Sequence, residues 1–280
     1  MKKTQNIKIN GLHQRPITLD IFSHEDADKS PLVLFIHGFK GFKDWGHFNL
    51  IADAFVKAGF SFVKFNFSHN GTTPDALEDF ADLEAFGQNN FTMELDETKL
   101  VIDYLEQQAS SSHYDFEKLY LIGHSRGGGI AVLTAFEDKR VKKLITWASV
   151  AFFDNLFKSI DTDKWKNDGV VYSFNSRTKQ DMPLYYQLYE DFRANADRLN
   201  IVQAASQLSI PWLIIHGKSD TSVAVRSAEQ LHACQPKSEL FLLEDAEHTF
   251  GGKHPYSDEH LPNDTALLIQ KSVQFLIASS

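Results

Sequence analysis

Three polar residues in the sequence have the types and spacing needed for nucleophilic catalysis. Ser125 lies in a Gly-x-Ser-x-Gly pattern between Gly123 and Gly127, and Asp220 and His248 follow later in the chain. A serine hydroxyl is a poor nucleophile at neutral pH, so it needs a base, and the base needs an orienting carboxylate. The sequence therefore predicts a triad of Ser125 as nucleophile, His248 as base and Asp220 as the orienting group.

The context of Ser125 is that of a sharp turn between a strand and a helix. An apolar run at residues 119–122 precedes it, and a second apolar run at residues 130–136 follows three consecutive glycines. This arrangement is typical of a nucleophile elbow, in which the serine backbone is strained and the glycines avoid steric clashes. The N-terminus of the following helix then favours negative charge near the serine. The alternative is a glycine-rich turn that carries a surface serine.

The other two members of the predicted triad lie just past predicted strands. Asp220 follows the apolar run at residues 212–215, and His248 follows the run at residues 240–243. Because the carboxyl ends of parallel strands meet at one edge of a sheet, these residues and Ser125 are expected there together.

Each of these two assignments has a structural alternative. Asp220 can instead cap the helix that follows it, as aspartate commonly does. His254 and His260 lie near His248 in the sequence and compete with it for the role of base. The joint occurrence of three residues at three strand ends favours the triad.

Acyl transfer also needs two backbone amides to hold the developing oxyanion. The residue after the nucleophile, Arg126, is expected to donate one, and the loop after the strand at residues 32–36 the other. In the sequence His37-Gly38-Phe39, the Phe39 amide is the expected donor, and His37 is expected to be structural. The role of the Arg126 side chain stays open, since on an elbow helix it can pair with a nearby acid and never meet substrate.

Apolar patterns along the chain predict alternating strands and helices. Continuous apolar runs predict strands covered on both faces, and spacings of three and four predict amphipathic helices. Strands are predicted at residues 7–9, 17–22, 32–36, 60–67, 119–122, 141–147, 212–215 and 239–243. Helices are predicted at residues 48–58, 76–86, 95–107, 130–136, 224–233 and 266–277. This alternation indicates an α/β protein with a mostly parallel central sheet, an antiparallel opening pair at its edge and helices on both faces.

Composition narrows the class of protein. The 280 residues are 42% hydrophobic and 23% charged, which suits a soluble globular protein. A net charge of −9 with scattered Lys and Arg disfavours nucleic-acid and anionic-membrane partners. The single cysteine cannot form an intrachain disulfide, and the basic N-terminus leads into polar residues, so no signal peptide is expected. We expect a cytoplasmic protein without membrane helices, and the oligomeric state stays open.

Four motifs resemble those of the α/β-hydrolase superfamily, and the match runs through nearly the whole chain. They are His37-Gly38-Phe39, Gly-His-Ser-Arg-Gly-Gly at residues 123–128, the segment 216–223 and the segment 247–250. Within the superfamily the chain is most similar to feruloyl esterases, dienelactone-hydrolase-like proteins and serine aminopeptidase-like hydrolases. The His-Gly-Phe loop is followed by a second glycine, Gly41, and this pattern indicates the feruloyl-esterase side of the group. The resemblance implies the same triad and the same two oxyanion donors.

One position departs from part of this group. True dienelactone hydrolases carry cysteine at the elbow, where this chain has Ser125. Cys234 lies on a predicted helix far from every motif and is expected to be a small buried residue. A dienelactone substrate is therefore not expected. Haloalkane dehalogenase and epoxide hydrolase activities are disfavoured too, because those relatives carry aspartate at the elbow.

Residues 151–206 interrupt the alternation of strands and helices. In a single α/β-hydrolase domain spanning residues 1–280, an insertion at this place is expected to form a cap over the active site, with a small hairpin near residues 168–176. Its many aromatic residues either give the cap its own core or line an acyl or aryl pocket. The candidates for substrate contact are Phe152, Phe153, Tyr172 and Phe174.

The favoured hypothesis is a serine hydrolase that cleaves small carboxylic esters through an acyl-enzyme. One alternative is a peptidase of the same fold acting on short peptides or amino-acid amides, with Asp44 or Asp161 holding the substrate amine. A second is a non-catalytic ligand- or partner-binding protein. We expect no metal and no cofactor, because the C-terminal histidines lack ligand spacing and no nucleotide-binding glycine motif occurs.

Overall fold

The computed structural model describes residues 1–25 and 29–278. The strands are β1 (Lys2–Asn10), β2 (Pro16–Ser23), β3 (Ser30–Ile36), β4 (Ser61–Asn66), β5 (Tyr114–His124), β6 (Val141–Trp147), β7 (Val170–Asn175), β8 (Gln180–Tyr185), β9 (Trp212–Gly217) and β10 (Glu239–Leu243). Within the described ranges, eight of them form one sheet of order β1-β2-β4-β3-β5-β6-β9-β10. Pairing is antiparallel from β1 to β4 and parallel across the rest. The predicted mostly parallel sheet with an antiparallel edge is confirmed.

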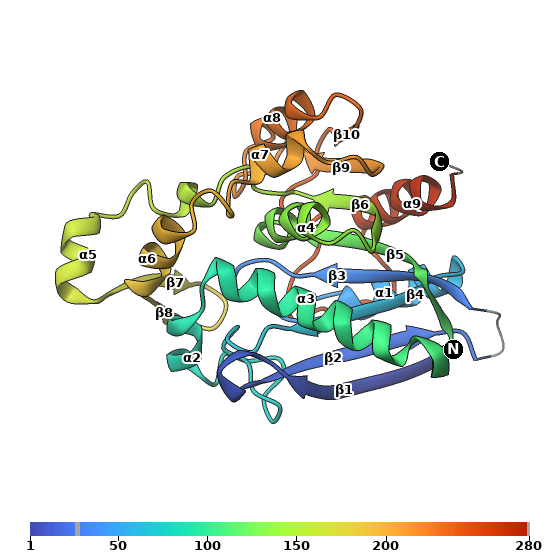
Figure 1. The fold of residues 1–280 in the computed structure, drawn as a ribbon, viewed down its shortest axis with the longest axis horizontal. Helices are drawn as coiled ribbons and strands as arrows, with labels where there is room; N and C mark the ends of the chain where they lie inside the picture. Colours follow the sequence, from blue (N-terminus) through green and yellow to red (C-terminus); the bar gives the residue numbers. More distant parts are fainter. Residues whose placement is uncertain (26–28, 279–280) are drawn as a thin grey trace.

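Helices cover both faces of this sheet. They are α1 (Phe48–Lys57), α2 (Leu83–Gln88), α3 (Phe91–Gln108), α4 (Arg126–Glu137), α5 (Thr162–Asp168), α6 (Gln187–Ala194), α7 (Ile201–Ser206), α8 (Arg226–Cys234) and α9 (Asn263–Ile277). The apolar sides of α3, α4, α7 and α8 share one core, and those of α1 and α9 share the other (Figure 1). None of the helices in the described part of the chain has the length and apolar character needed to cross a membrane.

The strand β3 shows why a continuous apolar run gives a central strand. Leu32 and Leu34 pack in the core shared with α3 and α4, and Val33 and Phe35 pack in the core shared with α1 and α9. Successive side chains of a strand point to opposite faces, so a strand between two helical layers needs apolar residues at every position. Each large apolar side chain that is fully buried contributes roughly 1.5–3 kcal/mol to stability.

Helix caps explain where two predicted boundaries differ from the structure. The helix α3 begins at Phe91, ahead of the predicted start, because the Asn90 side chain accepts a hydrogen bond from the Met93 amide at 2.9 Å. The helix α2 begins only at Leu83, because Asp82 caps it in the same way. A cap satisfies an amide that the helix itself leaves unpaired, so it sets the first turn. Cys234 ends α8 and is half-buried instead of buried.

The segment between β6 and β9, which we call the insert (residues 151–206), holds α5, α6, α7 and the β7–β8 hairpin. Figure 1 shows α5, α6 and the hairpin to one side of the sheet, at the end toward which β3 points. Trp165 is fully buried there, and its indole N–H donates to the Leu184 carbonyl at 2.8 Å. The rings of Phe157 and Tyr189 pack against it, at centroid distances of 5.9 and 6.2 Å. The Phe157 ring also contacts Phe91 of α3, so these aromatic residues join the core that the insert shares with that helix.

Four charged residues are buried together next to the sheet. Lys43 and Lys64 donate to the same Asp20 oxygen at 2.8 and 2.6 Å, and both also pair with Asp44. Burial raises the pKa of Asp20, but the ion pairs with Lys64 and Lys43 outweigh that effect and hold the pKa below its ordinary value. This cluster fastens the loop that carries Lys43 and Asp44 to β2 and β4.

Replacing Asp20 by alanine would leave two buried ammonium groups with one carboxylate between them. We expect Asp20→Ala to lower the free energy of unfolding by about 3–5 kcal/mol, the usual cost of breaking a buried ion pair from one side. Urea unfolding measures the change. The matched control is Asp53→Ala, because Asp53 pairs with Lys3 at the surface; such a loss should stay below about 1 kcal/mol. Equal losses in the two variants would contradict the argument.

Candidate active site

Ser125 occupies a strained turn between β5 and α4. Its φ is 57° and its ψ is −122°, a backbone conformation that residues other than glycine rarely adopt. The turn also packs closely on the loop after β3, since a Cβ on Gly127 would lie 2.4 Å from the carbonyl oxygens of Ile36 and His37. Only glycine fits at position 127. This is the backbone geometry of the predicted elbow.

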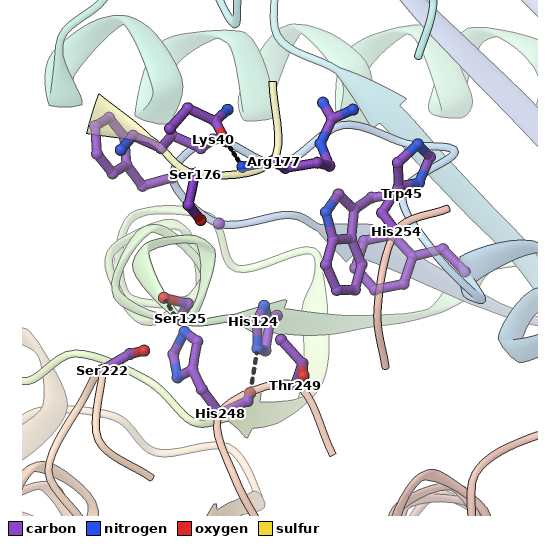
Figure 2. A pocket seen from close by; sticks show the side chains of 15 residues that line it. Lys40, Trp45, His124, Ser125, Ser176, Arg177, Ser222, His248, Thr249 and His254 are labelled. Atoms are coloured by element: carbon purple, nitrogen blue, oxygen red, sulfur yellow. Dashed lines mark hydrogen bonds between the residues drawn. The ribbon is translucent and has the colours of Figure 1, made fainter. Parts of the chain in front are cut away.

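The three residues of the predicted triad form one hydrogen-bonded chain. His248 Nε2 lies 3.0 Å from Ser125 Oγ, and His248 Nδ1 lies 2.7 Å from Asp220 Oδ2. Figure 2 shows Ser125 and His248 pointing toward one another across one side of the cavity. With Nδ1–H donating to the carboxylate, the Nε2 lone pair faces the serine hydroxyl. An imidazole in this tautomer can accept the hydroxyl proton.

Asp220 is the most heavily bonded residue of the site. Its Oδ1 accepts hydrogen bonds from the amides of Ser222 and Val223, both at 2.8 Å. Its Oδ2 accepts from His248 and also lies 3.2 Å from Nε2 of His216. Burial raises the pKa of Asp220, but the hydrogen bonds from His216 and His248 hold it far below its ordinary value. The carboxylate therefore stays ionised at neutral pH.

The alternatives for Asp220 and His248 do not fit the structure. The cap position of α8 is Val225, so Asp220 does not cap that helix. His254 Nδ1 accepts from the Gly46 amide at 2.8 Å, away from the serine, and His260 is exposed. Neither histidine replaces His248 next to Ser125.

The sheet brings the Asp220 and His248 loops together. Because β9 and β10 are parallel neighbours, the loops that follow them lie side by side. The Ser219 amide donates to the Ala246 carbonyl at 3.1 Å, and the Lys218 amide donates to the Leu243 carbonyl at 2.8 Å. These backbone bonds join the two loops ahead of Asp220 and His248, so the loops hold a fixed relative position.

Two histidines that sequence reasoning assigned no role support this arrangement. The Nε2–H of His124 donates to the backbone carbonyl of His248 at 2.9 Å, and His216 reaches Asp220 as described. Burial, with a smaller contribution from His248, lowers the pKa of His124 to about 3, so its imidazole is neutral. Their signal in the sequence is their position, since each stands in a motif at the end of an apolar strand.

The buried neutral imidazole of His124 has a consequence for stability. The unfolded chain binds a proton at His124 near the ordinary pKa of 6.5, whereas the folded chain binds it only near pH 3. The free energy of unfolding therefore falls as the pH drops below 6.5, by up to about 1.4 kcal/mol per pH unit for this group. We expect urea unfolding at pH 7, 6 and 5 to show a steeper fall for the wild type than for His124→Gln. Parallel slopes would contradict this assignment.

The loop after β3 crosses directly over the serine. A Cβ on Gly38 would lie 2.9 Å from the Ser125 Cβ, so only glycine allows this approach. His37 donates from Nδ1 to the Gly38 carbonyl at 2.9 Å, and burial lowers its pKa to about 4, which suits a neutral structural histidine. Phe39 follows Gly38, and Arg126 follows the nucleophile, so both residues lie near Ser125. The Arg126 side chain pairs with Glu94.

Two cavities lie near the nucleophile, and Ser125 itself lines the first of them. The cavity that we call the polar cavity, about 420 Å³, contains Ser125 and His248, and Lys40, Ser176 and Arg177 line it across from them (Figure 2). Asn175 and the aromatic residues Trp45 and Phe48 also line it. The aromatic cavity, about 320 Å³, is lined by Phe91, Arg126, Val150, Phe152, Phe153 and Leu156. Phe39 and Ser222 border both. Both cavities therefore have aromatic lining, and the polar cavity adds Lys40 and Arg177 to it.

The structure separates the four predicted substrate-contact residues into two pairs. Phe152 and Phe153 line the aromatic cavity. Tyr172 and Phe174 are 62% and 57% exposed and line neither of the two cavities described above. Because side chains alternate along a strand, these two share the solvent side of β7. The hairpin contributes Asn175 and the turn after it to the polar cavity instead.

The two acidic residues considered for binding a substrate amine lie elsewhere. Asp44 is paired with Lys43 and Lys64 in the buried cluster. Asp161 caps α5, accepting from the amides of Asp163 and Lys164. In the described part of the chain, no group of three or more His, Cys, Asp or Glu side chains is placed to hold a metal ion.

Comparison with known proteins identifies the family of the chain. The BD-FAE family model matches residues 19–234. The chain belongs to the BD-FAE family. Among curated proteins, YfhR of Salmonella typhimurium is 32% identical over 182 residues, which cover 62% of this chain and 56% of the relative. The match thus spans just over half the length of YfhR.

Two solved structures share the fold over nearly the whole chain. Est1E of Butyrivibrio proteoclasticus, solved with bound ferulic acid, has a TM-score of 0.74 at 16% identity and covers 97% of this chain and 98% of its own. The esterase domain of a Rhodothermus marinus protein has a TM-score of 0.66 at 16% identity, with 98% of each chain covered. These likenesses confirm the α/β-hydrolase fold of this BD-FAE protein.

Proposed function

We propose that this protein is a serine hydrolase that cleaves small carboxylic esters through an acyl-enzyme. The observation that carries the proposal is the hydrogen-bonded chain Ser125–His248–Asp220, with contacts of 3.0 and 2.7 Å at the mouth of a cavity. The BD-FAE family and the two esterases of the same fold support hydrolysis of esters.

In the proposed mechanism, Ser125 Oγ attacks the ester carbonyl while His248 Nε2 takes the hydroxyl proton. The Phe39 and Arg126 amides hold the tetrahedral oxyanion, as preorganised donors do in acyl transfer. His248 then gives its proton to the leaving alcohol, and the same nitrogen activates the water that releases the acid from Ser125. The ionised Asp220 holds the imidazole tautomer and stabilises the imidazolium.

The position of His248 indicates which part of the ester each cavity holds. The leaving oxygen must lie within reach of His248 Nε2 to be protonated, and His248 lines the polar cavity only. We therefore assign the alcohol to the polar cavity and the acyl group to the aromatic cavity. The apolar rings of that cavity favour an aryl or bulky acyl group. The bound ferulic acid of Est1E, an aryl acid, supports the same assignment.

The acidic residues that favoured the peptidase alternative do not line the candidate site. An aminopeptidase needs an acid beside the substrate amine, and Asp44 is already neutralised by two lysines. The polar cavity presents Lys40 and Arg177 and no carboxylate among its lining residues. This lining does not favour a cationic substrate.

Removal of the nucleophile tests the central claim. We expect Ser125→Ala to lower kcat/KM for p-nitrophenyl acetate by roughly 10³-fold or more, because residual rates without a triad residue come only from binding and the oxyanion hole. A fluorophosphonate should label the wild type at Ser125 and leave the variant unlabelled. Hydrolysis that survives in the variant would overturn the proposal, and so would an active wild type labelled at another serine.

The acyl assignment predicts a selective effect at the aromatic cavity. Phe152→Ala should lower kcat/KM for hydroxycinnamate esters by roughly tenfold, the effect of about 1.4 kcal/mol of lost apolar contact, and change acetyl ester turnover much less. Phe174→Ala is the matched comparison, because Phe174 lies on the same insert but outside both cavities. The measurement is steady-state kinetics on an acyl series with one leaving group. Equal losses for acetyl and cinnamoyl esters would contradict the assignment.

A further inference from the structure

The guanidinium of Arg126 is buried beside the nucleophile, and the proposed chemistry uses only the backbone amide of this residue. Its Nη2 lies 2.5 Å from Oε1 of Glu94, and the two side chains are 11% and 3% exposed. The same Oε1 accepts from Asn89 Nδ2 at 2.7 Å. Desolvation of two buried charges commonly cancels the attraction between them. Stability alone is therefore a weak reason for this ion pair.

The same guanidinium lies over two aromatic rings. Its Cζ is 4.6 Å from the ring centroid of Phe39 and 5.5 Å from that of Phe91. A cation at this distance is attracted to the face of a ring, more strongly when both are desolvated. Phe91 and Glu94 stand three residues apart in the first turn of α3, on one face of that helix. Arg126 therefore connects the start of α3 to the ring of Phe39.

Phe39 needs such a connection, because its backbone is part of a tight and strained loop. The following residue, Lys40, has a φ of 56°, and the preceding Gly38 packs against Ser125. The half-buried Phe39 ring packs against the core, with the Phe86 ring at a centroid distance of 5.6 Å, and the cations of Lys40 and Arg126 lie 5.3 and 4.6 Å from its centroid. The contacts of the Phe39 side chain therefore help to set the position of the Phe39 backbone in this loop.

We propose that the Arg126 side chain, held in place by Glu94, clamps the Phe39 ring and so fixes the spacing of the two oxyanion amides. Arg126 then acts twice, as a donor through its own amide and as a positioning residue for the Phe39 amide. Oxyanion donors stabilise the transition state only when they are preorganised at hydrogen-bond distance, so a looser Phe39 weakens that stabilisation. This inference rests on the proposed function.

The first test removes the clamp and keeps both amides. Arg126→Met should lower kcat for an acetyl ester by roughly 10–100-fold, less than the 10²–10³-fold loss of a whole oxyanion donor, with little change in KM. The affinity for phenylboronic acid should fall by a similar factor, because its tetrahedral adduct with Ser125 places an oxygen in the oxyanion hole. Binding of the product acid, which forms no such adduct, should change little.

The matched control removes a comparable arginine between the same two helices. Arg198 pairs with Asp96 of α3 and Glu137 of α4, and within the described residues no hydrogen bond or ion pair joins it to Phe39. Arg198→Met should therefore lower the melting temperature without changing kcat or boronate affinity. A loss of kcat in Arg126→Met without a loss of boronate affinity would overturn the clamp.

A double-mutant cycle with Phe39→Leu tests the contact itself. Phe39→Leu keeps the amide and the Arg126–Glu94 pair, so it also serves if Arg126→Met does not fold. The clamp predicts that Phe39→Leu loses kcat and boronate affinity together, and that the double variant is little worse than either single one. Additive losses would overturn the clamp. If the wild type is active and labelled but kcat is unchanged in both Arg126→Met and Phe39→Leu, only the clamp is refuted. If the wild type is neither active nor labelled, the proposed function and the clamp are refuted together.

Discussion

The close contact between the β5–α4 turn and the loop after β3 is the constraint on which the candidate site depends. Ser125 can leave the sheet in its strained conformation only because glycines at 38 and 127 let two backbones meet. The same contact brings the residues next to these backbones together, since the Arg126 guanidinium lies 4.6 Å from the centroid of the Phe39 ring. The cost of the strained turn is met by the surrounding core, in which β3 and β5 are parallel neighbours between two helical layers.

Hydrogen bonds between neutral and charged groups complete the site at its other side. Asp220 accepts from two backbone amides and from His248, with His216 3.2 Å away, which keeps it ionised although it is buried. His124 holds the backbone of His248 from the strand that ends in the nucleophile. Asp220 and His248 of the candidate triad are thus held in place by buried neighbours. Such support keeps the geometry of a reactive site preorganised.

Buried charge recurs around the loop after β3. Lys43 and Asp44 tie the far end of the loop to β2 and β4, and Arg126 with Glu94 reaches its near end at Phe39. Neither cluster is a strong source of stability, because desolvation offsets most of the attraction in such pairs. Each instead links a segment of the loop after β3 to a neighbouring element: β2 and β4 in one case and α3 in the other.

The sequence by itself determined the α/β layering, the elbow and the candidate triad. Its local signals suffice here, because apolar runs define central strands, glycines mark the close backbone contacts, and Ser125, Asp220 and His248 each follow a strand whose end is forced to one edge of the sheet. Only the tertiary structure decided what depends on contacts between distant segments. These are the pairing of Arg126 with Glu94, the support of Asp220 by His216, and the division of the site into two cavities. It also decided that Phe152 and Phe153 face a cavity while Tyr172 and Phe174 face solvent, because aromatic residues of the insert carry no periodicity that tells one side from the other.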